Sequence, residues 1–270
     1  MIDGALPYLR CPVCRASLSR DGQALRCSRG HSFDMARQGY ADLTAGRMPH
    51  VGDTAEMVAD RAAFLAAGHY DFIADALAAQ AEGDVVVDAG TGTGNYLARV
   101  LQALPEAVGL GLDVSKPALR RAAKAHPRAA AVLADLWRPL PMKDESASVI
   151  LDVFAPRNGA EFRRVLRRDG KLLLVTPGPE HLGELVTAYG MIGVDPGKSA
   201  RIDQSLGDHF TAEGVEEFRR ELNLSAAEAG TLVGMTPSAR HVRKFPEEAV
   251  AVTVAVEVAV YRPRRRARGE

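Results

Sequence analysis

Three cysteines and a histidine near the start of the chain are spaced like the ligands of a metal ion. The pattern C-x2-C-x12-C-x3-H is formed by Cys11, Cys14, Cys27 and His31. Thiolates and imidazole are preferred ligands of Zn²⁺, and four protein ligands close its coordination shell, as in structural sites. The spacer contains the Asp-Gly dipeptide of a hairpin turn. These residues predict a small zinc ribbon stabilised by its metal; the alternative is three reduced cysteines beside an unrelated histidine.

A glycine-rich turn in the first half of the chain is suited to approach a nucleotide-like ligand. A buried apolar run ends at Asp88 and leads into Gly90, Gly92, Thr93 and Gly94, after which apolar residues follow helical spacing. This order predicts a strand, a glycine turn and a helix whose first backbone amides face the ligand. The spacing D-x-G-x-G-x-G lacks the diphosphate-binding pattern G-x-G-x-x-G. It fits S-adenosylmethionine better.

Two further acids follow the next predicted strands. Asp113 ends the run AVGLGLD, at about the distance past a glycine turn at which an acid binds ribose hydroxyls, and Asp135 ends the run AAVLAD. Asp135 is placed to accept a hydrogen bond from an adenine amino group, with the amide of Leu136 facing a ring nitrogen. The carboxyl ends of parallel strands converge on one crevice, so these acids and Asp88 together predict an adenosine site. Taken singly, each acid is also compatible with capping a turn.

The elements that must position these residues alternate between strand and helix. This pattern predicts an α/β fold with a doubly wound, mostly parallel sheet of seven strands, of the class I methyltransferase type. Helical spacing is expected over 160–168 and helix-like composition over 212–224, whereas Val250 to Val260 alternate with period two and predict a strand of a terminal antiparallel hairpin. Residues 46–80 are helical by composition, with a break at Gly68.

Length and composition fit one large domain with a small appendage. The 270 residues are 47% hydrophobic and 25% charged with no net charge, which excludes a disordered chain. We expect a zinc domain over 1–45, a helical linker over 46–80 and a methyltransferase domain over 81–270. The sequence contains neither a membrane-spanning run nor a signal peptide, so a cytoplasmic location without membrane contact is expected. Local basic clusters at 163–168 and 261–270 are most simply solvated surface.

Several longer blocks of sequence carry a more specific resemblance. These blocks are the zinc-ligand segment, HSFDMARQGYADL, GDTAEMVADRAAFLAAGHY, DAGTGTGNY, LDVSKPALRRAAK, VFAPRN, TPGPEHLGEL and MTPSAR. With them the chain resembles the bacterial 23S ribosomal RNA guanine-N1 methyltransferases, and in particular the branch that confers resistance to tylosin. The resemblance covers nearly the whole chain.

The resemblance implies partners and further site residues. It implies an N-terminal zinc domain that helps to recognise a hairpin of 23S ribosomal RNA, a fold that binds S-adenosylmethionine, and a homodimer. It also implies that Tyr70 of the segment GHY contacts the cofactor and that His181 of TPGPEHL lines the site. The form DVFAPRN, which begins at Asp152, is similar to the resistance branch and favours the guanosine that this branch modifies.

The expected reaction is an in-line displacement at the sulfonium methyl, for which alignment of the nucleophile supplies much of the rate. Guanine N1 carries a proton that a base must remove, or the site must stabilise the form that lacks it. Asp152, at a strand end, is the best candidate base; the alternative is a carboxylate bonded to loop amides or to Arg157. Phe154 is a candidate to stack on an extruded guanine, against an ordinary core role. A structural role is likewise the alternative for His181.

Two other functions compete with this one. A small-molecule methyltransferase would use the glycine loop and keep the zinc ribbon only as a structural part. A non-catalytic zinc-dependent RNA-binding protein would keep the RNA surface without needing a pocket for a base. Only an RNA methyltransferase accounts for the ribbon, the glycine loop and the local arginines together.

Overall fold

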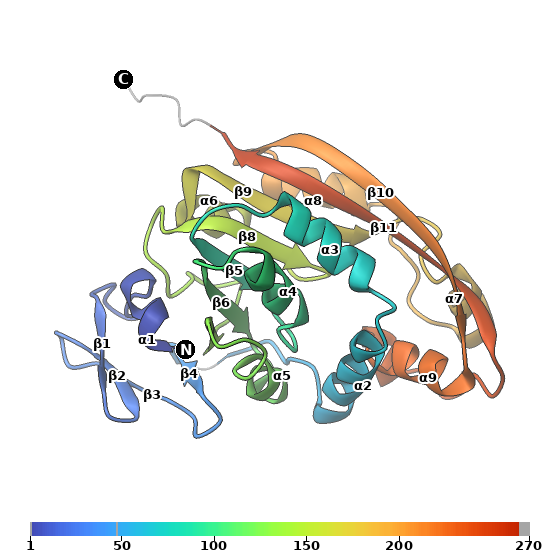
Figure 1. The fold of residues 1–270 in the computed structure, drawn as a ribbon, viewed down its shortest axis with the longest axis horizontal. Coiled ribbons are helices and arrows are strands. Elements are labelled where there is room, and N and C mark those ends of the chain that lie inside the picture. Colours follow the sequence, from blue (N-terminus) through green and yellow to red (C-terminus); the bar gives the residue numbers. More distant parts are fainter. Residues whose placement is uncertain (1, 47, 265–270) are drawn as a thin grey trace.

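The computed structural model describes residues 2–46 and 48–264, and its centre is one sheet of eight strands (Figure 1). The strand order is β10-β11-β9-β8-β5-β6-β7-β4. Pairing is parallel from β4 to β9 and antiparallel where β11 joins β9 and β10. The strands are β4 (Tyr40–Asp42), β5 (Val85–Ala89), β6 (Val108–Asp113), β7 (Ala129–Leu133), β8 (Ala147–Val153), β9 (Leu166–Pro177), β10 (Phe210–Leu224) and β11 (Val250–Pro263).

The predicted doubly wound sheet is confirmed, with one strand more than expected. Strands β5 to β9 and β11 lie where the sequence predicts them, and β4, which the prediction left within the zinc domain, adds an eighth strand beside β7. Every residue of β5 and of β8 is buried. Parallel strands covered on both faces carry such continuous apolar runs, and here alternate residues of β5 belong to different cores: Val85 and Val87 to one, Val86 to the other.

Helices cover both faces of the sheet (Figure 1). One core contains Phe162 of α6 and Ile202 of α8, and the other contains Leu77 of α3 and Leu101 of α4. The loops at the carboxyl ends of the parallel strands remain free to form a site. The helices are α2 (Ala55–Ala66), α3 (Asp71–Gln80), α4 (Asn95–Ala103), α5 (Lys116–Ala122), α6 (Gly159–Val165), α7 (Gly183–Tyr189), α8 (Lys198–Leu206) and α9 (Ala226–Gly234).

The segment 212–224 is not the helix that its composition suggested but most of strand β10. Its glutamates and arginines favour a helix locally, yet they also suit the exposed edge of a sheet, where charge discourages pairing with other chains. The partner decides: the valine-rich β11 pairs with β10 from Phe210 opposite Pro263 to Leu224 opposite Val250. The terminal antiparallel hairpin is thus confirmed, and tertiary pairing overrides the local preference. In addition, α6 ends at Val165, short of the expected 168.

The segment that links the two ends of the molecule contains two helices, as predicted. Gly68 has a φ of +82° and separates α2 from α3. The side chain of Thr54 caps α2 by accepting a hydrogen bond from the amide of Met57 at 3.3 Å. In Figure 1, α2 lies beside α9, while α3 lies on α4. The linker therefore spans from the ribbon to the far side of the sheet.

The zinc ribbon is a three-stranded antiparallel sheet preceded by the short helix α1 (Ile2–Ala5) and the turn η1 (Leu6–Tyr8). Its strands are β1 (Leu18–Asp21), β2 (Ala24–Cys27) and β3 (Ser32–Asp34). Leu9 and Leu25 are fully buried in the same core as Leu140 and Met142 of the main domain. The ribbon therefore packs against the large domain through a shared apolar core.

The structure also describes the first of the two basic clusters. The arginines at 163–168 are engaged within the fold: Arg163 is buried, Arg164 pairs with Glu161, and Arg167 donates to Asp84. The expectation of solvated surface is therefore wrong for Arg163 and Arg164, and it holds for the exposed Arg168. The basic tail extends beyond the described residues. Among the described residues, no helix has the length and apolar character to cross a membrane.

Candidate active site

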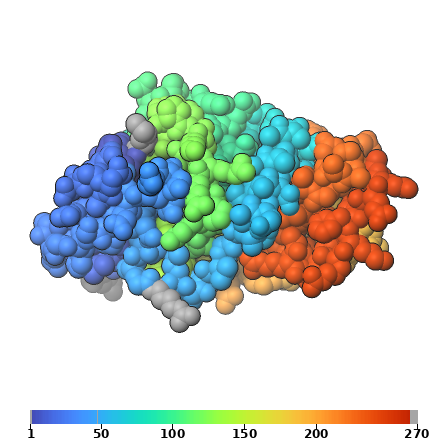
Figure 2. Space-filling view, turned by 90° about the horizontal axis from the view of Figure 1, so that it is seen from below, coloured from blue at the N-terminus to red at the C-terminus, as the bar shows by residue number. Residues whose placement is uncertain are grey.

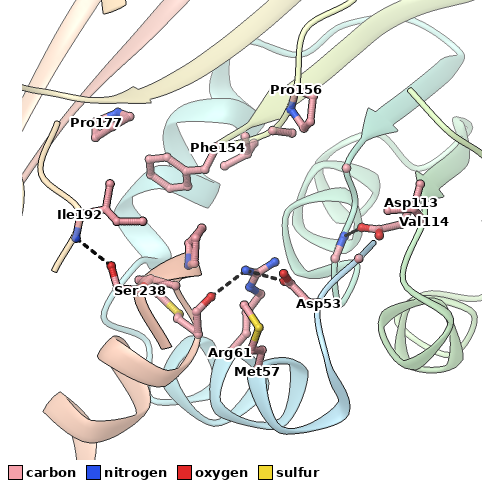
Figure 3. A pocket seen from close by; sticks show the side chains of 18 of the residues that line it. Asp53, Met57, Arg61, Asp113, Val114, Phe154, Pro156, Pro177, Ile192 and Ser238 are labelled. Carbon is pink, nitrogen blue, oxygen red and sulfur yellow. Dashed lines mark hydrogen bonds and ion pairs between the residues drawn. The ribbon is translucent and has the colours of Figure 1, made fainter. Parts of the chain in front are cut away.

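A cavity of about 870 Å³ opens at the carboxyl ends of the parallel strands (Figure 3). Its volume lies in the range of small-molecule and cofactor sites. Most of the predicted site residues line it: Tyr70, Gly90, Gly92, Thr93, Asp113, Asp135, Leu136, Phe154 and His181. The exceptions are Asp88, Gly94 and Asp152, which do not belong to the cavity wall.

The glycine turn lies between β5 and α4 and cannot carry side chains at its key positions. Gly90 has a φ of +83°, and a Cβ there would lie 2.5 Å from the Cβ of Ala155. Gly94 is the N-cap of α4 with a φ of +81°. The amides of Gly90 and Thr91 donate to the carbonyl of Leu112, which ties the turn to the next strand. The main chain of the turn therefore faces the cavity without intervening side chains at these glycines.

Asp113 lies directly beside the glycine turn and is hydrogen-bonded to it. Its Oδ2 accepts a hydrogen bond from the amide of Gly92 at 2.8 Å, and its Oδ1 accepts one from the amide of Ser115 at 2.7 Å. Burial raises the pKa of Asp113, although both amides favour its charged form. A carboxylate has about four acceptor positions, so Asp113 retains free ones toward the cavity.

Asp135 has a partner that the sequence did not suggest. Its Oδ1 accepts a hydrogen bond from the amide of Trp137 at 3.0 Å, and its Oδ2 lies 2.9 Å from Nδ1 of His50. The ring of His50 is also near that of Trp137, with centroids 6.1 Å apart. His50 belongs to the loop before α2, so this loop closes one side of the cavity against the predicted adenine position.

Asp88 lies beneath the glycine turn. Its Oδ2 accepts a hydrogen bond from the hydroxyl of Thr91 at 2.7 Å, and its side chain is almost fully buried. Burial raises the pKa of Asp88 to about 7. The structure therefore gives Asp88 a position that supports the turn, behind the wall that a ligand would touch.

Asp152 is the most enclosed of the predicted site residues. It is 0% exposed, stands opposite Ala89 in the pairing of β8 with β5, and neither carboxylate oxygen has a hydrogen-bond partner among the described residues. Burial raises the pKa of Asp152 well above its ordinary value, despite the charge of nearby Arg157. A buried carboxyl without a hydrogen-bond partner at the end of a strand is unusual enough to require a functional explanation.

Aromatic rings form the wall opposite the acids. Phe154 is 42% exposed and has a φ of +53°, a conformation that non-glycine residues adopt at a cost. Its ring centroid lies 6.4 Å from that of Tyr70 and 6.0 Å from that of His181. Burial lowers the pKa of His181 to about 4, so the imidazole is neutral at pH 7. The three predicted residues are thus together, and the strained backbone turns Phe154 into the cavity (Figure 3).

The cavity also contains residues that the sequence analysis missed. Asp53 and Arg61 come from the linker, Trp137 follows Leu136, and Ser238 and Arg240 come from the segment after α9. Trp137 is the one tryptophan of the chain and is 55% exposed. An isolated tryptophan next to a predicted binding residue was a signal in the sequence. The others lie in the blocks GDTAEMVADRAAFLAAGHY and MTPSAR, which carry the family resemblance, but their spacing assigned them no role, because only the packing of α2 against α9 brings them to the site.

The four predicted metal ligands meet at the ribbon end of the molecule. Their ligand atoms all lie within 4.8 Å of one another. The Sγ atoms of Cys14 and Cys27 are 3.6 Å apart, and the Sγ of Cys27 lies 3.4 Å from Nδ1 of His31. A tetrahedron with Zn–S of about 2.3 Å and Zn–N of about 2.0 Å requires edges of roughly 3.5 to 3.8 Å. The donor set therefore fits Zn²⁺, as predicted.

Comparisons with known proteins match two separate parts of the chain. Residues 9–45 match the zinc-ribbon family described as RlmA, N-terminal, and residues 86–170 match a methyltransferase domain. Among solved structures, a SAM-dependent methyltransferase of Anabaena variabilis is 18% identical with a TM-score of 0.50, covering 83% of this chain and 100% of that one. At this identity the likeness shows the fold alone. The methyltransferase domain and the crevice make S-adenosylmethionine the cofactor of this fold.

Two curated relatives match over nearly their whole length. A protein of Micromonospora griseorubida, named a putative 23S rRNA (guanine-N(1)-)-methyltransferase, is 54% identical over 96% of this chain and 98% of its own. The 23S rRNA (guanine(748)-N(1))-methyltransferase of Streptomyces fradiae is 46% identical over 95% of this chain and 97% of its own. Both alignments include the ribbon and the crevice, and on this evidence the chain belongs to the family of 23S rRNA (guanine-N1)-methyltransferases.

Proposed function

We propose that this protein transfers the methyl group of S-adenosylmethionine to N1 of a guanine in a hairpin loop of 23S ribosomal RNA. The observation that carries the proposal is the match to two relatives over both the zinc ribbon and the crevice. The Streptomyces fradiae relative favours the guanine equivalent to position 748. Modification at that position fits a role in resistance to tylosin-type macrolides, and a ribosomal RNA substrate supports a cytoplasmic location.

The chain's own groups suit the cofactor's parts. Asp113 retains acceptor positions for ribose hydroxyls, and Asp135 with the amide of Leu136 suits the edge of an adenine ring. The bare backbone from Gly90 to Gly94 lies between these groups and the aromatic wall. When bound, the cofactor supplies an electrophilic methyl on a sulfonium ion. Tyr70 and His181 occupy the other end of the cavity, where we place the methionine part and the target base.

The aromatic wall and Asp152 are assigned to the guanine. Phe154 presents a ring to the cavity at the carboxyl end of β8, and stacking on such a ring holds an extruded base. Asp152 precedes it by two residues, and burial raises its pKa, the direction that makes a carboxylate a stronger base. Acting as a base requires Asp152 to lose its proton and reach the guanine through a local shift when the substrates bind. Positioning of N1 in line with the methyl supplies the larger part of the rate.

The ribbon is assigned to RNA recognition. Figure 2 shows the face on which the ribbon at one end and the segment around α9 at the other flank the green and light-blue segments around α5 and α2. Arg29 and Arg37 of the ribbon and Arg120 of α5 are exposed on the protein and carry no ion pair among the described residues. Such unpaired cations suit contact with phosphates. A homodimer would present two such surfaces to one RNA.

The deciding experiment is methyl transfer with the full chain. Radiolabelled S-adenosylmethionine is incubated with a 23S RNA fragment that contains the hairpin, and mass spectrometry locates the modified nucleotide. Label on N1 of a single guanine supports the proposal, and the position of that guanine tests the equivalence to 748. Label on small nucleosides or metabolites alone would favour the small-molecule alternative, and RNA binding without transfer would favour a non-catalytic protein. Light scattering at the working concentration tests the dimer.

A further inference from the structure

Arg61 of helix α2 is fixed at the edge of the glycine turn. Its Nη2 lies 2.8 Å from Oδ2 of Asp53 and donates a hydrogen bond to the carbonyl of Met235, also at 2.8 Å. The side chain is 28% exposed and lines the cavity. Figure 3 shows Arg61 between Asp53 and the segment after α9. Two anchors from opposite ends of the chain thus determine where this guanidinium points.

The remaining donors of Arg61 face the glycine turn. Nη1 lies 3.1 Å from the position that a Cβ on Gly92 would occupy, so the missing side chain of Gly92 is what admits the guanidinium. A guanidinium has five N–H donors, and the two anchors use those of Nη2. Among the described residues, Nη1 and Nε have no hydrogen-bond acceptor. A partly buried arginine with free donors, aimed into a cavity, is typical of a site for a carboxylate or phosphate.

The cofactor of the proposed function offers one anionic group, the carboxylate of its methionine part. Among the described residues, the arginines that line the cavity are Arg61 and Arg240. Arg240 is exposed at the rim, where its Nη2 donates to the carbonyl of Gly52 at 3.3 Å. Arg61 lies on the glycine turn itself and is less exposed, so a charge-assisted hydrogen bond to it is less screened by water.

We propose that Arg61 binds the α-carboxylate of the cofactor and that Asp53 is a positioning residue for it. This inference rests on the proposed function, because it takes S-adenosylmethionine as the ligand. Nη1 donates to the carboxylate, while Asp53 and the carbonyl of Met235 hold the plane of the guanidinium. Asp53 also lines the cavity, where its carboxylate is an acceptor for the neighbouring α-ammonium. The helical linker thereby contributes to cofactor binding as well as joining two domains.

The test compares ligands that differ by the carboxylate alone. The affinities of S-adenosylhomocysteine and of its decarboxylated analogue, the 3-aminopropyl thioether of adenosine, are measured by calorimetry for wild type, Arg61→Met, Arg61→Lys and the surface control Arg168→Met. We expect Arg61→Met to weaken the binding of S-adenosylhomocysteine about 10- to 100-fold and to leave the affinity for the analogue within about twofold of wild type. Arg61→Lys should recover part of the loss, and Arg168→Met should bind both ligands like wild type.

The outcomes separate the inference from the function on which it rests. The role of Arg61 would be overturned if Arg61→Met bound S-adenosylhomocysteine as tightly as wild type. It would also be overturned if both Arg61 variants lost affinity equally for the two ligands. Either outcome would leave the proposed function standing. Failure of wild type to bind S-adenosylhomocysteine at all would overturn the proposed function. The role of Asp53 is checked with Asp53→Asn, which should weaken S-adenosylhomocysteine more than it weakens the analogue.

Discussion

The zinc ribbon and the cofactor crevice each hold several polar groups within a few ångströms, but they do so by different means. The four metal ligands all come from residues 11–31, in two short turns joined by a hairpin. The residues around the crevice come from segments between 49 and 240, and strands β5 to β9 together with helices α2, α4 and α7 must be in place before they meet. The ribbon is thus a local structure, whereas the crevice is a product of the whole fold.

The means of stabilisation differ in the same way. The ribbon has short strands with mostly exposed residues, and the apolar residues that it buries pack against the large domain. Metal binding supplies on the order of 10 kcal/mol to such sites. The crevice stands on strands that are buried throughout, and burial there shifts the pKa values of Asp88, Asp113 and Asp152 upward. A local ion stabilises one site, and long-range burial shapes the chemistry of the other.

The largest effect is expected from a substitution that removes the metal site, because it should affect the ribbon and not the crevice. Cys27→Ser should abolish zinc binding and unfold the ribbon, because three ligands leave the site incomplete. The affinity of the crevice for S-adenosylhomocysteine should stay within about twofold, since the crevice is built on the main sheet and contains none of the metal ligands. Elemental analysis and calorimetry measure the two quantities. Joint loss of zinc and ligand binding would break the comparison.

The next largest effect concerns the buried acid beside the crevice. Asp152→Asn should lower the rate of methyl transfer by about 10²- to 10⁴-fold without changing the affinity for S-adenosylhomocysteine, if Asp152 accepts the proton of N1. The wild-type rate should rise with pH as the carboxylate forms, because burial raises its pKa. Single-turnover rates across a pH series provide the measurement, with the surface variant Asp75→Asn as control. A full rate in Asp152→Asn would assign the residue to support of the turn.

A smaller effect is expected from filling the bare turn. Gly90→Ala places a Cβ 2.5 Å from that of Ala155 at a φ of +83°. Strain of about 1 to 3 kcal/mol should weaken the binding of S-adenosylhomocysteine roughly tenfold or more. A titration followed by Trp137 fluorescence measures this affinity. Zinc content should not change. The matched control is Gly230→Ala in α9, where a Cβ meets no atom within 4 Å.

The smallest effect is on stability and its dependence on pH. In the unfolded chain Asp88 ionises near pH 4, whereas the folded protein retains its proton up to about pH 7. Between these values the unfolded state binds fewer protons, so this residue makes the wild type less stable as pH rises. Asp88→Asn removes that penalty and should stabilise the protein by on the order of 2 kcal/mol at pH 8, with a gain that vanishes toward pH 4.

Urea denaturation at pH 4.5 and at pH 8 measures this difference. Cofactor affinity in the same variant tests the structural position of Asp88 beneath the turn: it should remain close to that of wild type, because the amide oxygen of asparagine still accepts from Thr91. A large loss of affinity would restore Asp88 to the set of residues that contact the cofactor.

Residue types and spacing determined what is local in this protein. The zinc ligands, the order strand–glycine turn–helix, the break at Gly68 and the period-two strand up to Val260 all follow from neighbours in the chain. Each depends on the geometry of a few consecutive residues, so no knowledge of the remaining fold is needed. The acids at strand ends were also predictable, because parallel strands deliver their carboxyl ends to one edge of a sheet.

Only the tertiary structure decided what depends on distant partners. Residues 212–224 form a strand because they pair with the valine-rich strand β11. Asp88 lies behind the glycine turn because the surrounding fold buries its side chain. Arg61 reaches the glycine turn because α2 packs against α9, which joins Asp53 to Met235. Contacts between segments that are far apart in the chain leave no periodicity or spacing in the sequence, and these contacts place the charges of the crevice.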